Sequence, residues 1–206
     1  MKIIWDLDGT LFNTWDAHVS ALRKVEKCLK GRKSSLLKIM HNQANTIDRT
    51  LSYSFGNDCF HEAQMLYKRY FLEEIEHETI CDSIYMVEFI HKHLEYENVI
   101  FTGRDEQTSA YILDHFNIRG CFTEIHCVVG ADSDKNKEIR QRQGIFHNGF
   151  YITDDEKEYI HLKDASVIFI LAAWYKKTGK YKRIGYEVDN LESLNNLIAN
   201  YNLNNR

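Results

Sequence analysis

The stretch that decides the fold is "IIWDLDGTLFNTWDAH", residues 3–18, in which an apolar run ends in two aspartates, Asp6 and Asp8. The run of large apolar residues indicates a buried strand, and the Gly-Thr pair after the aspartates indicates a tight turn off its end. Two carboxylates this close repel each other unless positive charge lies beside them. The pattern therefore predicts a metal-assisted reaction at the end of the first strand rather than a solvated turn.

The bulk composition is that of a globular protein. The chain has 206 residues, enough for one domain with an insert or for two small domains, and 44% of them are hydrophobic and 27% charged. A formal net charge of −4 argues against a general nucleic-acid binder. No apolar run approaches the roughly 18 residues of a membrane span, and no signal-peptide pattern is visible. Five cysteines without a C-x-x-C pair indicate reduced thiols, so we expect a cytoplasmic protein.

Five short apolar runs predict strands, and their lack of polar alternation is typical of a parallel sheet covered on both faces. They are residues 2–7, 98–102, 124–129, 149–153 and 166–173. Helical patterns separate the later runs, among them "SAYILDHFNI", "DKNKEIRQRQ" and the stretch from Asp155 to Ala165. This alternation predicts an α/β fold with a doubly wound, Rossmann-like parallel sheet.

The first strand breaks this rhythm, because about ninety mostly helical residues separate it from the second. Helical patterns over 15–31, 34–51 and 59–78 predict a helical insert, whereas a fourth over 83–94 leads into the second strand. We therefore predict two domains. The α/β core takes residues 1–13 plus 81–206, and the helical domain takes residues 14–80.

Polar residues with a shared chemistry follow the predicted strands at the edge where ligands gather in open parallel sheets. They are Asp6, Asp8, Thr102, Gly103, Arg104, Lys135, Asp154 and Asp155. Carboxylates are the ligands that Mg²⁺ prefers, and a hydroxyl and a lysine suit a phosphoryl group. The sequence therefore predicts a magnesium and phosphate site at this edge.

Four segments carry a specific resemblance. "DLDGTLFNT" resembles motif I of the haloacid dehalogenase (HAD) superfamily, whose pattern is D-x-D-G-T/V after an apolar strand. "IFTGR" is similar to motif II, "DKNKEI" to motif III and "YITDDEKE" to motif IV, in the family's order. The helical insert resembles the C1 cap found in phosphoglycolate phosphatase and β-phosphoglucomutase, and "YEVDNLESLNNLI" resembles the family's C-terminal helix. The resemblance covers nearly the whole chain and implies a HAD-like core with an inserted helical cap.

The resemblance implies a catalytic role for each motif residue. Asp6 would attack phosphorus and form an aspartyl-phosphate, and Asp8, holding a proton, would act as acid and then as base. Thr102 would bind the phosphoryl oxygens, and Lys135 would neutralise both phosphate and nucleophile. Lys137 is the alternative to Lys135, because it lies two residues further along the same motif.

The resemblance also implies a Mg²⁺ site. Asp6, the main-chain carbonyl of Asp8 and Asp154 would bind the ion, with Asp155 as a further ligand or as support. Motif IV departs from the family's G-D-x-x-x-D, since Thr153 stands for the glycine and Glu158 for the last aspartate. The second acidic partner is therefore either Asp155 or Glu158.

The expected activity is Mg²⁺-dependent hydrolysis of a small phosphorylated metabolite. Substrate contacts are predicted from Thr102, Gly103, Arg104 and Lys135, and from His18 in the cap. The alternatives are a phosphomutase, a phosphatase acting on nucleotides or nucleic-acid ends, and a non-catalytic phosphate-binding protein. A basic cap segment, "RKVEKCLKGRKSSLLK", is the only support for a nucleic-acid substrate, and we expect neither a nucleic-acid nor a membrane partner. The sequence leaves the substrate and the oligomeric state open.

Overall fold

The computed structural model describes residues 1–32, 35–77, 83–162, 166–175 and 185–204. The described strands form one sheet in the order β3-β2-β1-β4-β5-β6, and all neighbours in it are parallel. The strands are β1 Lys2–Trp5, β2 Glu97–Thr102, β3 Glu124–Cys127, β4 Gly149–Thr153, β5 Ile168–Ala172 and β6 Tyr186–Val188. The predicted α/β fold with a parallel, Rossmann-like sheet is confirmed.

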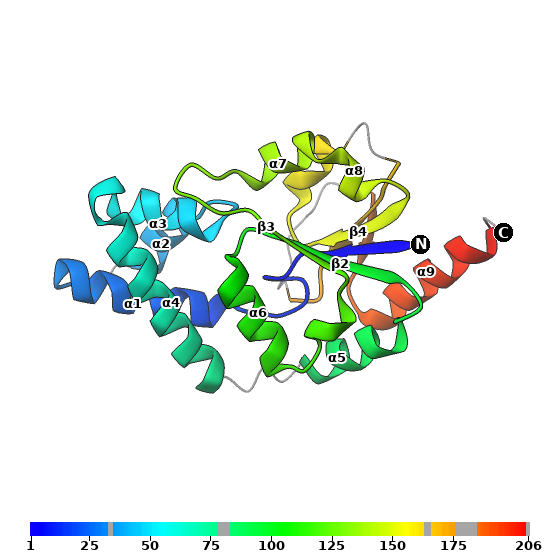
Figure 1. The fold of residues 1–206 in the computed structure, drawn as a ribbon, viewed down its shortest axis with the longest axis horizontal. Coiled ribbons are helices and arrows are strands. Elements are labelled where there is room, and N and C mark those ends of the chain that lie inside the picture. Colours follow the sequence, from blue (N-terminus) through cyan, green and yellow to red (C-terminus); the bar gives the residue numbers. More distant parts are fainter. Residues whose placement is uncertain (33–34, 78–82, 163–165, 176–184, 205–206) are drawn as a thin grey trace.

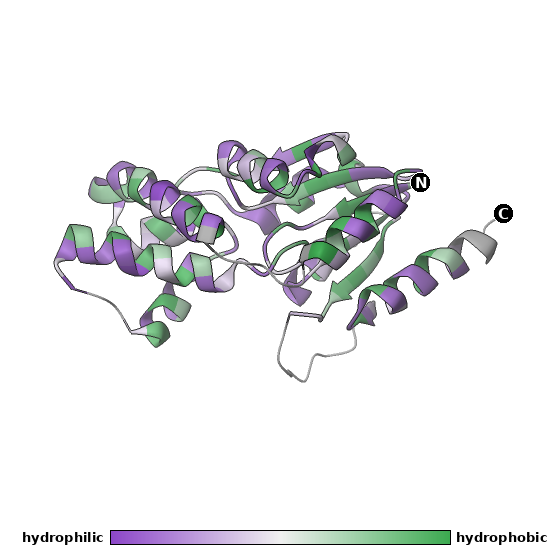
Figure 2. Ribbon diagram, turned by 90° about the horizontal axis from the view of Figure 1, so that it is seen from below, coloured by the Kyte–Doolittle hydropathy of each residue, from purple (hydrophilic) through white to green (hydrophobic). Residues whose placement is uncertain are grey.

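Helices cover both faces of the sheet, which is why its inner strands carry apolar residues at consecutive positions. In β1, Ile3 and Trp5 belong to one apolar cluster and Ile4 to the other. Figure 1 shows two helix layers on opposite sides of the sheet, and Figure 2 shows how strongly hydrophobic the strands are. One layer is α5 Ser83–Lys92, α6 Glu106–His115 and α9 Leu191–Asn204; the other is α7 Lys135–Gln141, α8 Gln143–Phe146 and the 3-10 helix η3 Glu156–His161.

Four helices group at one end of the molecule, beyond the carboxyl ends of the strands (Figure 1). They are α1 Trp15–Lys30, α2 Leu36–Asn42, α3 Ile47–Phe55 and α4 Phe60–His77, with a short 3-10 turn, η1 Asn57–Cys59, before α4. Helix α1 ends at Gly31, whose left-handed φ of 65° makes the predicted glycine cap. The apolar side chains of α1 and α4 join the same buried cluster as the core. The cap helices fall within the predicted 14–80 segment; the exact domain boundaries stay a prediction.

Several secondary-structure predictions differ from the structure. The helix predicted over 34–51 is two helices, α2 and α3, with residues 43–46 between them. Strand β6, of three residues, went unpredicted because it is too short to give an apolar run. The third predicted strand, 124–129, ends at Cys127, at the sheet edge where its side chains are only partly buried. The helix predicted over 155–165 is the 3-10 helix η3, and residues 163–165 lie outside the described part of the chain.

Strand β1 lies between β2 and β4 in the sheet. The chain runs from β1 to β2 and β3 in one half of the sheet, and then crosses to β4, β5 and β6 in the other half. This is the topological switch point, where the loops after adjacent strands diverge and leave a crevice. The cap helices cover that crevice. No helix among the described residues is long and apolar enough to cross a membrane. Cys28, Cys59, Cys121 and Cys127 are free thiols, and the fifth cysteine, Cys81, lies outside the described residues.

Candidate active site

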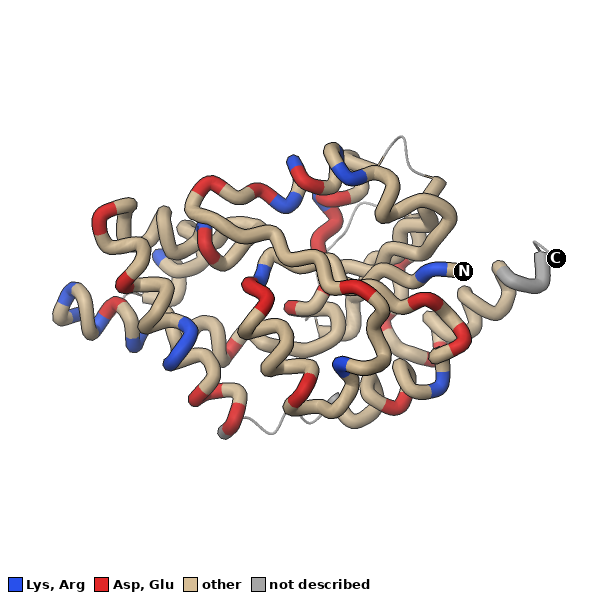
Figure 3. The backbone as a smooth tube through the Cα atoms, in the orientation of Figure 1, with Lys and Arg blue, Asp and Glu red and all other residues tan. Residues whose placement is uncertain are grey.

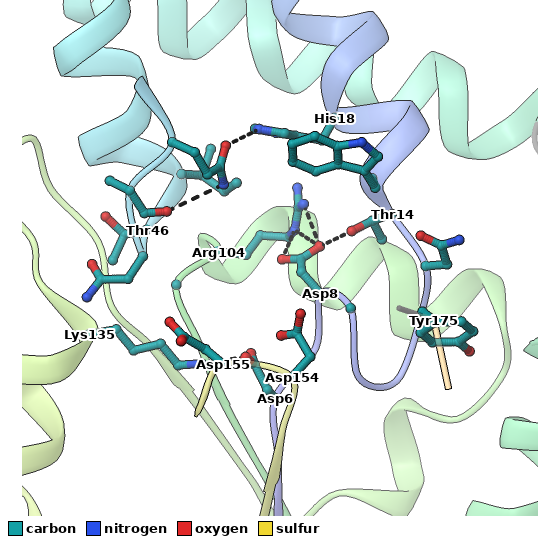
Figure 4. Close-up of a pocket in the computed structure, with 18 of the residues that line it drawn as sticks. Asp6, Asp8, Thr14, His18, Thr46, Arg104, Lys135, Asp154, Asp155 and Tyr175 are labelled. Atoms are coloured by element: carbon teal, nitrogen blue, oxygen red, sulfur yellow. Dashed lines mark hydrogen bonds and ion pairs between the residues drawn. The ribbon is translucent and has the colours of Figure 1, made fainter. Parts of the chain in front are cut away.

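A cavity of about 640 Å³ lies between the carboxyl ends of the central strands and the cap. Figure 4 shows Asp6, Asp8, Asp154 and Asp155 near one another at its base, with the Asp8 carboxylate turned toward Arg104. Lys135 reaches in from the side, and His18 comes down from the cap. The switch point thus brings together residues that are up to 149 positions apart, Asp6 and Asp155.

Asp6 directly follows β1, and its side chain is held by three donors. The Leu7 amide donates to Oδ1 at 2.8 Å, and the Thr153 hydroxyl donates to Oδ2 at 3.2 Å. Lys135 Nζ lies 2.6 Å from the same Oδ2. Burial raises the pKa of Asp6 to about 7, although Lys135 acts in the opposite direction. These donors therefore hold the Asp6 carboxylate in one orientation, but the charge of Lys135 offsets the effect of burial on its pKa only in part.

Lys135 stands at the first position of α7 because Asp134 caps that helix, accepting from the amides of Asn136 and Lys137. Its ammonium lies between Asp6 and Glu158, 2.9 Å from Glu158 Oε1. Burial alone would lower the pKa of Lys135, but the two carboxylates outweigh it and the pKa lies well above its usual value. Lys137 is exposed, so the structure places Lys135, and not Lys137, at the site.

Glu158 is buried, with 1% of its surface exposed. The Tyr151 hydroxyl donates to Oε2 at 2.5 Å, and Lys135 holds Oε1, so both carboxylate oxygens are engaged. Burial raises the pKa of Glu158, and Lys135 opposes that shift. Glu158 thus positions Lys135, whereas Asp155 lies with Asp154 on the cavity wall. Tyr151 could not be selected from the sequence, because it looks like an ordinary apolar residue of strand β4.

Gly9 explains the glycine in motif I. Its φ is +74°, a conformation that favours glycine, and a Cβ at this position would lie 2.6 Å from Asp154 Oδ2. The turn closes through the Gly9 amide, which donates to the Phe12 carbonyl at 2.8 Å. Without a side chain at residue 9, the Asp154 carboxylate can lie close to the loop that carries Asp6 and Asp8.

Asp8 is held by Arg104 and Thr14. Arg104 Nη2 donates to Oδ1 at 2.7 Å and Nε to Oδ2 at 3.0 Å, and the Thr14 hydroxyl donates to Oδ1 at 2.5 Å. The guanidinium also lies 3.8 Å above the ring of Phe71, in cap helix α4. Burial would raise the pKa of Asp8, but Arg104 outweighs it and the pKa lies below its usual value. The structure thus differs from the predicted protonated Asp8, because the predicted substrate ligand Arg104 pairs with it instead.

Thr102 and Gly103 take different positions. Thr102 is fully buried below the cavity, and its hydroxyl accepts from the Arg104 amide at 3.2 Å. Gly103 lines the cavity, where the cap comes so close that a Cβ would lie 2.4 Å from the Asn45 carbonyl oxygen. The predicted phosphoryl contact from Thr102 therefore stays a prediction, while Gly103 marks where cap and core touch.

A loop of the cap between α2 and α3 is docked on the core loop after β3. Asn45 Nδ2 and Arg49 Nη1 donate to the two oxygens of Asp134, at 2.9 and 2.8 Å. The hydroxyls of Thr46 and Ser133 lie 2.6 Å apart. Burial would raise the pKa of Asp134, but Asn45 and Arg49 lower it to about 2. Sequence reasoning missed these contacts, because they join residues of the cap and of the core that lie more than eighty positions apart in the chain.

His18 lies on the cap side of the cavity with both ring nitrogens engaged. Nδ1 lies 2.8 Å from the Tyr67 hydroxyl and Nε2 lies 2.9 Å from Gln43 Oε1. An amide oxygen only accepts, so Nε2 carries the proton and Nδ1 accepts from tyrosine. Burial lowers the pKa of His18 to about 4, so the ring is neutral near pH 7. His18 orients Gln43; a direct contact with substrate stays a prediction.

The basic cap segment lies away from the cavity. None of its described residues, 23–32 and 35–38, lines the cavity wall. Lys24 pairs with Glu73 and Glu74, and Lys38 with Glu26. Figure 3 shows positive positions of α1 at the outer end of the cap. The structure therefore gives no support to a nucleic-acid role for this segment.

The residues at the base of the cavity fit a hard divalent cation. Among the described residues no group of three or more His, Cys, Asp or Glu side chains forms a ready-made metal site. Mg²⁺ needs no such group, since it usually keeps several waters and takes one or two carboxylates. Asp6 and Asp154 supply these, and Gly9 leaves room beside Asp154. The donor set is therefore suited to Mg²⁺.

Sequence comparison identifies the family. The family model of haloacid dehalogenase-like hydrolases matches residues 3–170. This match spans most of the chain and includes all four motif regions. The chain therefore belongs to the haloacid dehalogenase-like hydrolases. No curated protein sequence matches it.

Solved structures share the fold over nearly the full length. A predicted phosphatase from Clostridium acetobutylicum has 19% identity and a TM-score of 0.74, covering 97% of this chain and 98% of its own. A predicted phosphoglycolate phosphatase from Haemophilus somnus has 15% identity and a TM-score of 0.71, with coverages of 95% and 96%. The putative HAD-hydrolase YfnB from Bacillus subtilis, bound to magnesium, has 16% identity and a TM-score of 0.69, with coverages of 96% and 98%. At these identities the likeness shows the fold alone.

Proposed function

We propose that this protein is a Mg²⁺-dependent phosphatase that hydrolyses a small phosphorylated metabolite through an aspartyl-phosphate on Asp6. The observation that carries the proposal is the geometry around Asp6. Its carboxylate faces the cavity at the switch point, held 2.6 Å from the Lys135 ammonium, with Asp8 on the same turn. A nucleophile, a fixed cation and a second carboxylate are what double displacement at phosphorus requires.

Asp6 and Asp154, with the main-chain carbonyl of Asp8, would hold the Mg²⁺ ion. When bound, the ion supplies positive charge that keeps Asp6 ionised and offsets the charge of the phosphoryl oxygens. The magnesium in the structural neighbour from Bacillus subtilis supports this assignment. Lys135 supplies a second, permanent positive charge at the Asp6 carboxylate.

The reaction takes two displacements. Asp6 Oδ forms a bond to phosphorus while the bond from phosphorus to the leaving oxygen breaks, and a leaving oxygen that needs a proton takes it from protonated Asp8. Water then attacks phosphorus, its proton passes to Asp8, and the bond between phosphorus and Asp6 breaks to release phosphate. Between the two displacements, Lys135 stays beside the Asp6 carboxylate, which then carries the phosphoryl group.

The protonation state of Asp8 determines which substrates suit a first assay. Arg104 keeps Asp8 ionised, which suits its role as base in the second displacement. To protonate a leaving oxygen in the first displacement, Asp8 must first take up a proton, which Arg104 opposes. We therefore expect p-nitrophenyl phosphate and acetyl phosphate to react readily, because their leaving groups need no proton.

The test is hydrolysis of these two compounds by the purified protein with Mg²⁺ and after removal of divalent ions with EDTA. We expect turnover only with Mg²⁺, and a loss of about 10³-fold or more in Asp6→Asn. Asp58→Asn, at an exposed position of the cap, is the matched control and is expected to keep wild-type activity. Activity in Asp6→Asn equal to that of the control would refute the proposal.

A further inference from the structure

We propose that the active-site cavity selects phosphomonoesters whose leaving group is uncharged and hydroxyl-bearing, and disfavours leaving groups that carry a second anion such as a carboxylate. This inference rests on the proposed phosphatase function and names its substrate class. It follows from the charges and hydrogen bonds of the cavity wall.

Both positive side chains that line the cavity in the described part of the chain are already paired. Lys135 lies between Asp6 and Glu158, at 2.6 and 2.9 Å. Arg104 is 1% exposed, donates twice to Asp8 and stacks on the Phe71 ring. A buried, bidentate ion pair of this kind is not free to turn toward a substrate. One donor of the guanidinium, Arg104 Nη1, is buried and has no hydrogen-bond partner among the described residues. The charges of Lys135 and Arg104 are nevertheless already offset by Asp6, Glu158 and Asp8, so a second anionic group on the substrate would find no uncompensated cation among these residues.

The wall beyond the phosphoryl end of the cavity is polar but uncharged, apart from one acid. Its polar residues are Asn13, His18, Gln43, Asn45 and Thr46, its apolar residues include Trp15, Ala44 and Ile47, and the acid is Asp16. His18 is neutral and its two nitrogens are occupied by Tyr67 and Gln43, so it adds no positive charge. A carboxylate placed here would meet Asp16 and gain no ion pair.

The hydrogen-bonding capacity of this wall suits hydroxyl groups. Asn45 Nδ2 donates to the Asp134 carboxylate, and this fixes the orientation of the amide, since a carboxylate only accepts. Asn45 Oδ1 is buried and accepts no hydrogen bond from the described residues. A hydroxyl can donate to such an oxygen, whereas a carboxylate would repel it. Trp15, which is 38% exposed, offers an apolar ring against which the carbon chain of a substrate can pack.

The distinction bears on the names of the structural neighbours. The leaving group of phosphoglycolate carries a carboxylate, and a neighbour from Haemophilus somnus is described as a predicted phosphoglycolate phosphatase. Because the two chains are only 15% identical, the substrate in that name does not carry over to the cavity of this chain. Transferring a carboxylate out of water without a partner lowers the binding affinity by more than about tenfold. The wall therefore favours the uncharged analogue.

The experiment compares two pairs of substrates that match in size and differ in charge: glycerol phosphate with phosphoglycerate, and hydroxyethyl phosphate with phosphoglycolate. In both pairs we expect kcat/KM with Mg²⁺ to be at least about tenfold higher for the uncharged leaving group. Gln43→Lys should reduce that ratio by placing a cation on the wall, and Gln43→Glu, its matched control, should increase it. Asp16→Asn should also reduce the ratio.

The outcomes separate this inference from the function on which it rests. Equal or higher kcat/KM for the carboxylated partners would overturn the inference and leave the phosphatase function standing. A preference for uncharged partners that Gln43→Lys and Gln43→Glu change equally would also overturn it, since the preference would then not be electrostatic. Failure to hydrolyse p-nitrophenyl phosphate and all four esters would overturn the proposed function itself.

Discussion

At the scale of single residues, the site depends on carboxylates whose surroundings give them different tasks. Asp6 is held by a cation and two neutral donors and faces the cavity. Asp8 is tied to Arg104 and Thr14. Glu158 is enclosed by Lys135 and Tyr151 and touches neither of the other two. In the proposed mechanism the same functional group serves as nucleophile, proton carrier and positioning residue according to its partners.

Glu158→Gln tests the positioning of Lys135. The substitution keeps the shape of the side chain but removes one of the two charges that hold the ammonium, so Lys135 is expected to shift relative to Asp6. We expect kcat for p-nitrophenyl phosphate to fall about 10- to 100-fold with a smaller change in KM. Glu187→Gln, at an exposed position of β6, is the control. Equal kcat in the two variants would show that Glu158 has no such role.

Protonation of the buried His18 side chain is expected to change the free energy of unfolding with pH. Its pKa is about 4 in the folded protein and about 6.5 in the unfolded chain, so the unfolded state binds more protons between these values. The contribution of His18 to stability is therefore expected to fall as pH drops from about 6.5 toward 4, by up to about 3 kcal/mol, while Asp6, whose pKa is raised, contributes in the opposite direction. The difference between the wild type and a His18 variant isolates the His18 contribution. Urea denaturation at about pH 7 and about pH 5 measures this fall.

The fall should be smaller in His18→Gln, which cannot take up a proton. His147→Gln is the control, because that side chain is exposed on the core. If His18→Gln and His147→Gln lost the same free energy of unfolding on acidification, the buried His18 would not be the cause.

At the scale of elements, the sequence predicted the parts that have a local pattern. The strands and the carboxylates at their ends follow from apolar runs and from the D-x-D-G-T segment, because parallel strands place their carboxyl ends at one edge. Strand β6 and the 3-10 character of η3 did not follow, because three residues show no periodicity and local pattern does not distinguish a 3-10 from an α-helix. The docking of Asn45 and Arg49 on Asp134 was beyond sequence reasoning, since only the folded chain brings the two loops together.

Gly103→Ala tests the contact between cap and core. A Cβ here would lie 2.4 Å from the Asn45 carbonyl and 2.9 Å from Thr46 Cα, which are backbone atoms, so the cap loop would have to move. The hydrogen bond from the Ile47 amide to the Gly103 carbonyl, 3.0 Å, would be disturbed as well. We expect kcat/KM to fall at least about tenfold.

Gly120→Ala is the matched control for this variant. No atom lies within 4 Å of the Cβ that would be added at Gly120, so we expect kcat/KM to stay near the wild-type value. A Gly103→Ala variant as active as Gly120→Ala would show that the close approach of the cap loop does not matter for turnover.

At the scale of the whole molecule, the cavity is formed by two parts that differ in charge, the sheet and the cap. The sheet supplies charged groups at its switch point, and the cap supplies a largely uncharged wall over them. The cap also contributes Phe71 to the surroundings of Arg104, so the state of Asp8 depends on both parts. The pairing of Asp8 with Arg104 could not be predicted from sequence, because the motif pattern suggested a substrate contact for the arginine.

The central claim, that hydrolysis proceeds through a phosphorylated Asp6, predicts the stereochemical course at phosphorus. Each in-line displacement inverts phosphorus, so two displacements retain its configuration and one inverts it. The measurement is hydrolysis, with Mg²⁺, of p-nitrophenyl phosphorothioate made chiral at phosphorus by its sulfur and two different oxygen isotopes, in water carrying the third isotope. The account predicts inorganic thiophosphate with retained configuration; inverted configuration would mean direct attack by water and would contradict it.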